Sequence, residues 1–271
     1  MTEPSVLFRV EDGVAVATLN EGDRMNPLTE AVQAGLKDAI ARVREDRAIR
    51  AMVLTASGRG FCAGADLKDF SRRAGELPAG DSLGRYVGRM MEDTANPILH
   101  GLRNLPVPLV CAMNGVAAGG GVGIALAADV VVAARSASFY LSFVPALGIV
   151  PDMAATWALL RSVGRARAMG LTLTGEKLSA EKAAQWGVIW GCVDDERLMP
   201  EAMGIARQLA ALPGHAIAET RALLDAAEDN TLDQQLVLER ERQAALIDGA
   251  SFAEGVQAFM QRRKPVFSGR M

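Results

Sequence analysis

Histidine and cysteine are scarce in this chain of 271 residues, which contains two histidines and three cysteines. The cysteines, Cys62, Cys111 and Cys192, are far apart and odd in number. Such a pattern fits a reducing compartment and argues against a disulfide framework. Neither His100 nor His215 has cysteines or carboxylates at the spacing of a metal site. The sequence therefore predicts no metal centre and no disulfide-stabilised scaffold.

Long blocks of one charge and long uninterrupted apolar runs are also absent. The 29 basic and 32 acidic residues are interspersed and sum to a net charge of −3. No basic stripe is available for a nucleic-acid backbone. The most apolar stretch, 108–135, is interrupted by glycines and by Asp129, unlike a membrane helix. Residues 1–10 lack the pattern of a signal peptide. We expect a cytoplasmic protein that binds neither nucleic acid nor membrane.

Half of the residues are apolar, while only 5% are aromatic, a mix that suits packed helices and buried strands. In the first part of the chain, short β-rich runs alternate with segments of helical periodicity, beginning with a hairpin at Asp12–Gly13. This alternation predicts an α/β domain with largely parallel strands. The predicted strands are 6–10, 14–19, 51–55, 109–113 and 130–133; the predicted helices are 29–43, capped by Thr29, and 90–105; 71–82 is predicted to be a mobile loop.

The pattern changes in the last third of the chain. From residue 152 onward it is almost entirely helical, apart from a short predicted strand at 188–193. A domain boundary near residue 195 would separate a core, 1–195, from a helical region, 196–271. That region must bury its apolar stripes on the core or on another subunit. Its predicted helices are 197–212, 215–228, 232–247 and 252–263.

Two glycine-rich turns follow predicted strands: Gly-Phe-Cys-Ala-Gly-Ala-Asp-Leu at 60–67 and Asn-Gly-Val-Ala-Ala-Gly-Gly-Gly-Val-Gly at 114–123. Small residues let a ligand approach the backbone, and a helix N-terminus offers free N–H donors. If both turns face one cleft, two N–H groups can stabilise one oxyanion. Two other readings are tight packing alone and a nucleotide loop. Neither turn has the Lys-Ser/Thr ending of a phosphate loop or the acidic residue of a dinucleotide fold.

The segments Phe-Cys-Ala-Gly-Ala-Asp-Leu and Asn-Gly-Val-Ala-Ala-Gly-Gly-Gly together resemble the motifs of the enoyl-CoA hydratase/isomerase (crotonase) superfamily. The resemblance extends from the turn at 24–26 to the ending at 263–267. It implies an α/β spiral core of ββα units with a C-terminal helical trimerisation region. It also implies an acyl-CoA substrate, no cofactor apart from the coenzyme A of that substrate, and a homotrimer or a dimer of trimers.

The resemblance assigns roles to residues by their position in these motifs. The backbone N–H groups of Ala65 and Gly120 would hold the thioester oxygen. The resemblance also implies that a basic cluster contacts a coenzyme phosphate, either in the same subunit or in a neighbouring one. The alternative is that this cluster is only a solvated helix end. The cluster consists of Arg262, Arg263 and Lys264. The residues expected along the coenzyme are Arg24, Ala63, Ala65, Asp66 and Leu67.

Hydratases of the family use two glutamates, and neither is present here. The corresponding positions, both expected at the substrate site, are Gly123 and Val144. One acid, Asp152, remains nearby. From the residues alone, Asp152 is predicted to be the N-cap of the next helix. A helix terminus would lower the pKa of Asp152, whereas burial would raise it. Its place after Leu-Gly-x-x-Pro resembles the single acid of the phenylacetate-pathway isomerases, which act on ring-1,2-epoxyphenylacetyl-CoA and also shift enoyl double bonds.

The resemblance therefore implies an acyl-CoA isomerase in which Asp152 is the catalytic acid and base. One carboxylate suffices for a 1,3 proton shift, because the same group can remove a proton and then return it. Two other classes stay open. One is a hydratase, lyase or hydrolase of the same fold, and the other is an acyl-CoA-binding protein without catalytic activity.

Overall fold

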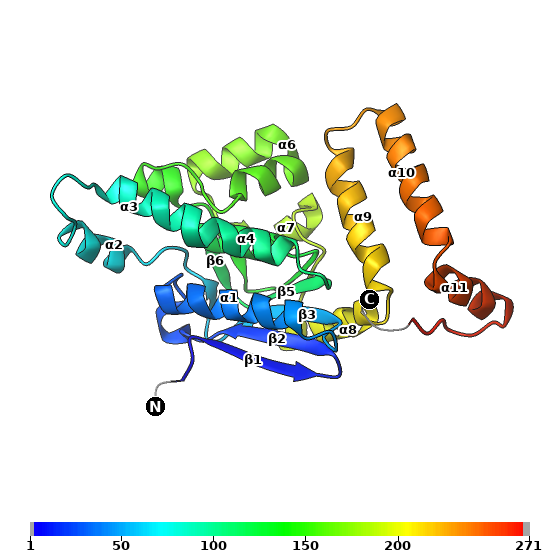
Figure 1. Cartoon of the computed structure of the whole chain (residues 1–271). Helices are drawn as coiled ribbons and strands as arrows, with labels where there is room; N and C mark the ends of the chain where they lie inside the picture. Colours follow the sequence, from blue (N-terminus) through cyan, green and yellow to red (C-terminus); the bar gives the residue numbers. More distant parts are fainter. Residues whose placement is uncertain (1–2, 268–271) are drawn as a thin grey trace.

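The computed structural model describes residues 3–267 and contains two β-sheets (Figure 1). The larger sheet has six strands in the order β1-β2-β3-β5-β7-β10. Its first two strands form the predicted antiparallel hairpin at Asp12–Gly13, and every other neighbouring pair is parallel. The strands are β1 (Val6–Glu11), β2 (Val14–Leu19), β3 (Ala51–Ala56), β5 (Leu109–Met113), β7 (Val130–Ala134) and β10 (Gly191–Val193).

The smaller sheet has four strands in the order β4-β6-β8-β9. Its strands β4, β6 and β8 are parallel and follow β3, β5 and β7 in the chain, so each turn of the chain contributes one strand to each sheet before a helix. The predicted spiral of ββα units is therefore confirmed. The strands of this sheet are β4 (Gly60–Cys62), β6 (Val116–Ala118), β8 (Ser138–Tyr140) and β9 (Leu178–Ser179).

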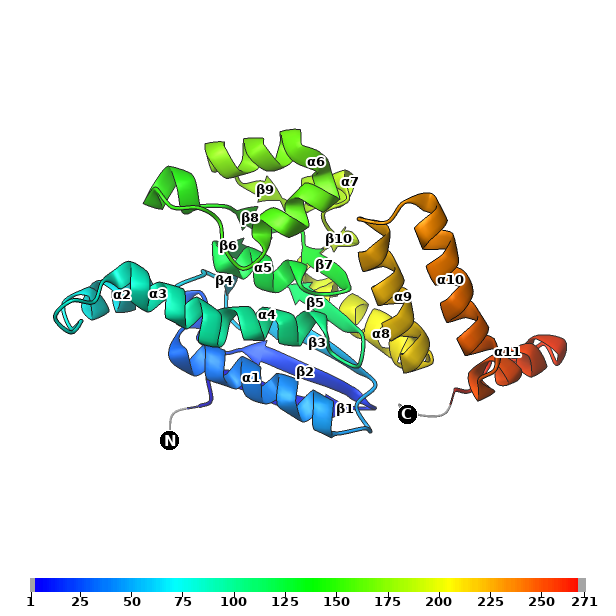
Figure 2. The ribbon, with the colours of Figure 1, turned by 45° about the horizontal axis from the view of Figure 1, so that its top comes forward.

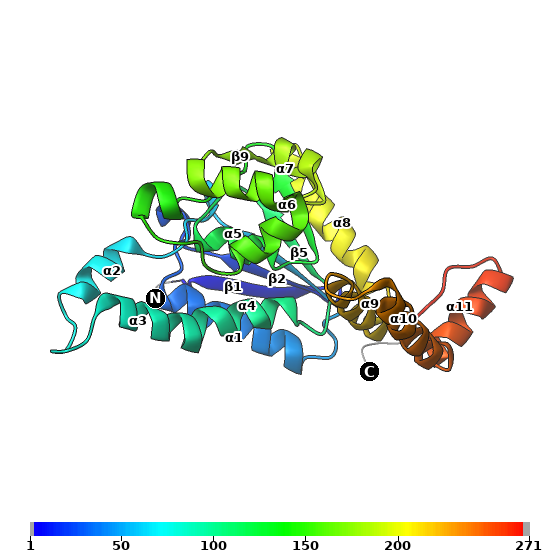
Figure 3. The same cartoon turned by 90° about the horizontal axis from the view of Figure 1, so that it is seen from above.

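Helices cover both faces of the larger sheet (Figures 1 and 3). On one side α1 (Glu30–Glu45) packs on β1, β2 and α4 (Asn96–Arg103). On the other side α8 (Leu198–Ala210) contacts β2, β3, β5 and β7. The predicted cap of α1 is confirmed, since Thr29 Oγ1 accepts a hydrogen bond from the Val32 N–H at 3.1 Å. The core is continuous across these layers.

The prediction of a loop at 71–82 is wrong in its first part. Helix α2 (Leu67–Ala74) continues into it, and only 75–82 connects α2 to α3 (Leu83–Met90). Asp66 caps α2 by accepting from the N–H groups of Lys68 and Asp69. Arg72 also forms ion pairs with Asp69 and Glu76, which favour a helix in a segment whose composition predicted a loop. Helix α3 continues through the π-helical segment η2 (Met91–Ala95) into α4, so the predicted helix at 90–105 begins earlier.

The chain after β8 is mostly helical, as predicted. Helices α9, α10 and α11 extend away from the two sheets (Figures 1 and 2). Because α8 lies on the larger sheet, the projecting part begins at α9, and the boundary near residue 195 stays a prediction. Within 3–267, no helix is long and apolar enough to span a membrane. The helices are α6 (Ala155–Thr174), α7 (Ala180–Trp186), α9 (Gly214–Ala227), α10 (Leu232–Ile247) and α11 (Ala250–Met260).

The buried side chain of Asn26 holds the first turn of the site to the loop before β4. Its Oδ1 accepts from the Glu21 N–H at 2.8 Å, and its Nδ2 donates to the carbonyls of Ser57 (2.9 Å) and Gly60 (2.8 Å). We expect Asn26→Ala to destabilise the protein by about 3 kcal/mol, because one buried and two partly buried hydrogen bonds of a buried side chain are lost. Urea unfolding measures this, with exposed Asn96→Ala as control. A loss of less than about 1 kcal/mol would contradict this role of Asn26.

Candidate active site

A cavity of about 380 Å³ lies among α1, α2, α3, the start of α5 (Gly120–Leu126) and the segment that precedes α6. Ala65, Gly120 and Asp152, the three predicted catalytic residues, all line it. Most of the remaining wall is apolar, and includes Leu36, Phe70, Val87, Ile98, Ile124 and Phe143. A mostly apolar cavity with a few polar groups is typical of a site for a small organic ligand.

The two glycine-rich turns meet because β4 and β6 are parallel neighbours, so both turns leave the same edge of the smaller sheet. Gly64 has a φ of +81°, and a side chain there would have its Cβ 2.8 Å from the Ala118 oxygen and 3.0 Å from the Gly120 nitrogen. Only glycine permits this approach. The Gly64 carbonyl also accepts from the Leu28 N–H at 2.8 Å. The peptide that carries the Ala65 N–H is thereby held beside the N-terminus of α5.

The N–H groups of Ala65 and Gly120 are left without a backbone acceptor within residues 3–267. The neighbouring Gly119 N–H is used, since it donates to the Tyr140 carbonyl at 3.0 Å. Gly120 is the first residue of α5, so its N–H has no acceptor in the helix. The site thus offers two unsatisfied backbone donors at one cavity, and either can bind an oxygen that gains negative charge.

Asp152 is not the helix cap that its sequence position favours. Helix α6 begins at Ala155 with Ala154 in the cap position, and no side chain caps it. Oδ1 of Asp152 is instead buried without a hydrogen-bond partner. Burial raises the pKa of Asp152, and a backbone hydrogen bond within Asp152 opposes the shift only in part. Desolvation, expected from the sequence to raise the pKa of Asp152, is the largest cause of its shift.

Gly123 lies beneath the segment that carries Asp152, not in the cavity wall. Met153 and Ala154 both have positive φ values, +50° and +55°, which turn the chain sharply after Asp152. A side chain at position 123 would have its Cβ 2.6 Å from the Met153 Cβ and would overlap the Met153 carbonyl oxygen. At Gly120, an added Cβ would lie 3.5 Å from Asp152 Oδ1. The absence of the first family glutamate therefore makes room for the segment that presents Asp152.

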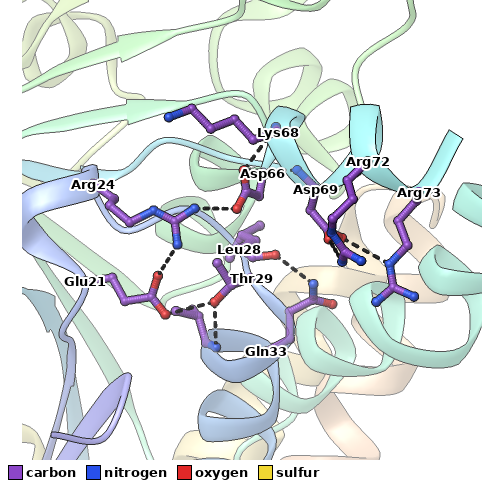
Figure 4. Close-up of polar contacts among 11 residues, drawn as sticks. Glu21, Arg24, Leu28, Thr29, Gln33, Asp66, Lys68, Asp69, Arg72 and Arg73 are labelled. Carbon is purple, nitrogen blue, oxygen red and sulfur yellow. Dashed lines mark hydrogen bonds and ion pairs between the residues drawn. The ribbon is translucent and has the colours of Figure 1, made fainter. Parts of the chain in front are cut away.

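Four acidic residues line the cavity, and three of them are paired with arginines. Arg24 bonds to Asp66 at 2.5 Å, and Asp69 pairs with Arg72 and Arg73 (Figure 4). Glu30 forms an ion pair with Arg73. Within the described chain, Asp152 has no such partner. It is the cavity carboxyl free to exchange a proton with a ligand.

The Arg24–Asp66 pair ties the turn before α1 to the cap of α2. Burial raises the pKa of Asp66, but the bond and charge of Arg24, with the N–H groups of Asp69 and Lys68, outweigh burial and lower that pKa. Arg24 also contacts Glu21 at 3.4 Å, and Glu21 accepts from the Thr29 hydroxyl at 2.9 Å (Figure 4). Arg24 itself does not line the cavity, but it contacts Asp66, which does.

The remaining residues of the predicted site are spread more widely. Asp66 and Leu67 line the cavity, and Ala63 is exposed just before them. Val144 is half-buried on the π-helical segment η3 (Phe143–Leu147) and is not part of the wall, whereas Phe143 is. Lys264 is exposed in the segment after α11, and helix α11 lies on the opposite side of the molecule from α2 and α3 (Figure 1).

Gln33 also lies in the cavity wall, although no sequence motif predicted it there. Gln33 is a polar residue within the buried face of α1, next to Val32 and one turn before Leu36. A polar residue within the apolar face of a predicted helix was the feature of the sequence that could have indicated a residue of the site. The turned backbone at Met153 had no comparable signal, because positive φ values at methionine and alanine do not follow from residue type.

Paired strands that feed two sheets, and two glycine-rich turns that meet at an apolar cavity, define a crotonase fold. The family model for enoyl-CoA hydratase/isomerase matches residues 9–270. The chain therefore belongs to the enoyl-CoA hydratase/isomerase family, and the resemblance of its motifs is confirmed.

Individual relatives agree on the family and differ in the reaction they are named for. A 1,2-epoxyphenylacetyl-CoA isomerase of Escherichia coli (strain K12) is 45% identical over 265 residues, 98% of each chain. A Rhodobacter capsulatus protein named "Probable enoyl-CoA hydratase" is 40% identical over 270 residues, 100% of each chain. The crystal structure of an enoyl-CoA hydratase from Polaromonas sp. JS666 superposes with a TM-score of 0.89 at 30% identity, covering 97% of this chain and 99% of that one.

Proposed function

We propose that this protein is an acyl-CoA isomerase in which Asp152 moves a proton along the acyl chain of a bound thioester. The main support for the proposal is the environment of the Asp152 carboxyl group. Its Oδ1 is buried near Gly120 without a hydrogen-bond partner and burial raises its pKa, while the other acids of the cavity are paired with arginines. Perturbed, partnerless carboxyls in apolar cavities are characteristic of acid–base catalysis.

In the proposed mechanism, the thioester oxygen accepts hydrogen bonds from the N–H groups of Ala65 and Gly120. These bonds stabilise the enolate that forms when the α-proton leaves. The Asp152 carboxylate takes that proton and becomes a neutral acid. The electron pair shifts along the chain, the double bond moves into conjugation with the thioester, and Asp152 returns the proton to the γ-carbon. The carboxylate is regenerated, and no other reactant is consumed.

The same site is a poor match for hydration. The two positions that carry glutamates in hydratases of the family hold Gly123 and Val144, and neither residue lines the cavity. Asp152 therefore has no second carboxyl partner with which to hold and activate a water molecule. The isomerase named among the relatives acts on 1,2-epoxyphenylacetyl-CoA, so we propose two substrate classes: 3-enoyl-CoA thioesters and the ring-epoxide thioester.

We further propose a homotrimer or a dimer of trimers that uses α9, α10 and α11 as contacts. These helices leave large apolar side chains exposed, including Leu224 (67%), Leu232 (74%) and Phe259 (82%). In such an assembly the cluster Arg262, Arg263 and Lys264 would face a coenzyme phosphate bound to a neighbouring subunit. Light scattering of the purified protein tests the assembly, and a monomer at micromolar concentration would overturn it.

The reaction is tested by incubating the protein with 3-enoyl-CoA, 2-enoyl-CoA and 1,2-epoxyphenylacetyl-CoA and following the products by mass and chromatography. We expect 3-enoyl-CoA to be converted to 2-enoyl-CoA without a change in mass. The ring-epoxide should likewise give an isomer of equal mass. Rapid addition of water to 2-enoyl-CoA would favour a hydratase instead, and binding of all three thioesters without conversion would indicate a protein that has lost catalysis.

The oxyanion contact predicts the effect of a proline at position 65. Ala65→Pro removes one backbone N–H, and we expect kcat to fall by about 100-fold or more, the size seen when a donor to an oxyanion is removed. Ala65→Gly keeps the N–H and serves as the matched control, with kcat within about threefold of the native protein. Equal losses in the two variants would show that the side chain at 65, and not its N–H, is what matters.

A further inference from the structure

Helices α2 and α3 and the connection between them form a hairpin, residues 67–90, that extends away from the two sheets (Figures 1 and 3). No residue of α2 or α3 is buried, whereas α1 buries six residues and α4 buries four. Helix α3 also has Gly84 and Gly88 in its interior, and glycine lowers the stability of a helix. The α2–α3 hairpin therefore depends on contacts with other parts of the protein or with a ligand.

The apolar side chains of the hairpin face the cavity. On α3 they lie at positions 83, 86, 87 and 90, the spacing of one face of a helix. All of them are half-buried or exposed, and the cavity is the space in front of them. A ligand that fills the cavity would give these side chains the packing they lack. The hairpin residues in the apolar lining are Leu67 and Phe70 from α2, and Leu83, Tyr86, Val87 and Met90 from α3.

The hairpin is held to the rest of the protein at its start, at its end and at one point between them. At its start, Asp66 caps α2 and pairs with Arg24. At its end, α3 continues through η2 into α4. Between these points Arg73, near the end of α2, forms an ion pair with Glu30 in the first turn of α1. The Arg73–Glu30 pair therefore joins the middle of the hairpin to the opposite wall of the cavity.

Arg73 contacts both helices of the hairpin as well as α1. Its Nε lies 3.5 Å from Asp69 Oδ2 on α2 (Figure 4), and its guanidinium carbon lies 5.4 Å from the centre of the Tyr86 ring on α3. Its side chain is 29% exposed, compared with 53% for Arg72, the residue before it. A partly shielded charge is screened less by solvent and salt than a fully exposed one. The position of Arg73 thus couples α1, α2 and α3.

We propose that Arg73 is a positioning residue for the acyl site: its ion pair with Glu30 closes the α2–α3 hairpin on α1, and the hairpin then packs against the acyl chain. The inference rests on the proposed acyl-CoA function and adds a residue outside the chemical step. Arg73 does not line the cavity, so it acts through the side chains of α2 and α3 that do. Ala65 and Gly120, the proposed thioester contacts, line the same cavity, so the acyl chain is the part of the ligand that reaches the hairpin.

Binding of unreactive ligands tests the ion pair. Saturated acyl-CoA thioesters and free coenzyme A are titrated by calorimetry into the native protein and its variants. Arg73→Gln and Glu30→Gln should each weaken acyl-CoA binding by about threefold, the effect of a partly exposed ion pair, and leave the Kd of free coenzyme A unchanged. Because the two residues share one interaction, the double variant should bind no more weakly than Arg73→Gln alone. Arg89→Gln is the matched control, since Arg89 pairs with Asp81 inside the hairpin, and it should keep the native affinity.

Hydrogen exchange measured by mass spectrometry follows the hairpin itself. The amides of α3 should exchange more slowly with an acyl-CoA bound than with free coenzyme A, because the acyl chain supplies apolar contacts. This protection should be smaller in Arg73→Gln. During turnover of a 3-enoyl-CoA, the KM of Arg73→Gln should rise about threefold with kcat within about twofold, because the proposed catalytic groups lie outside the hairpin.

The inference is overturned if free coenzyme A protects α3 as strongly as an acyl-CoA does, or if Arg89→Gln loses as much affinity as Arg73→Gln. It is also overturned if neither Arg73→Gln nor Glu30→Gln changes acyl-CoA binding, or if Arg73→Gln lowers kcat more than it raises KM. All of these results leave the proposed function intact. A protein that binds no acyl-CoA, or isomerises none, contradicts the proposed function itself.

Discussion

Replacing Asp152 by Asn is expected to lower kcat for isomerisation of a 3-enoyl-CoA by at least about 100-fold, the contribution of a positioned acid–base group. The asparagine side chain has the same size and fills the same buried position, but it cannot accept and return a proton. Binding of an unreactive acyl-CoA should change little, because the N–H groups of Ala65 and Gly120 remain. The change is measured as a loss in kcat with Kd within about threefold.

The pH dependence of the reaction should carry the signature of the same group. Asp152 must be ionised to remove the α-proton, and burial raises its pKa in the folded protein. The kcat/KM of the native protein should therefore rise with pH through a value above the usual range of aspartate. A rate that is flat through the acid range, or that persists in Asp152→Asn, would show that another group moves the proton.

The same substitution should make the folded protein more stable near neutral pH. A carboxyl whose pKa is higher in the folded than in the unfolded state binds protons more readily when folded, so its contribution to stability decreases as pH rises through that interval. Above it, native Asp152 holds a partly buried charge without a partner, and Asn does not. We expect a higher Tm for Asp152→Asn at neutral pH, with the difference shrinking in acid. Exposed Asp38→Asn is the matched control and should shift Tm little.

Restoring the missing glutamate by Gly123→Glu is expected to disable the protein, not to convert it into a hydratase. A Cβ at position 123 would overlap the Met153 backbone, which must then move together with Asp152. We expect a loss of about 3 kcal/mol in the free energy of unfolding, at the upper end of overpacking effects. Isomerisation should fall at the same time because Asp152 is displaced.

Urea unfolding and the two activity assays measure these effects together. Gly204→Ala is the control, because position 204 is exposed on α8 with open space around it, and alanine there should be neutral or slightly stabilising. The double variant Gly123→Glu, Val144→Glu should also fail to hydrate 2-enoyl-CoA. A stable Gly123→Glu protein that retains isomerisation would show that Gly123 does not set the position of Asp152.

Local interactions made several elements predictable from the sequence. The hairpin at Asp12–Gly13 and the Thr29 cap of α1 depend on residues close together in the chain, and both are confirmed. The extent of α2 was missed because its stability comes from the Asp66 cap and ion pairs, which outweigh a loop-like composition. The composition of a segment does not predict its secondary structure when a few side-chain contacts determine whether a helix forms.

The sequence by itself was enough to predict the family and the fold, because its two glycine-rich turns resemble the motifs of the enoyl-CoA hydratase/isomerase family. It also determined which acids are absent. Only the tertiary structure decided that Asp152 lines the cavity with its Oδ1 buried and caps no helix, and that Gly123 makes room for Met153. The reason is physical. Desolvation and close packing depend on segments far apart in the chain, and no local pattern contains that information.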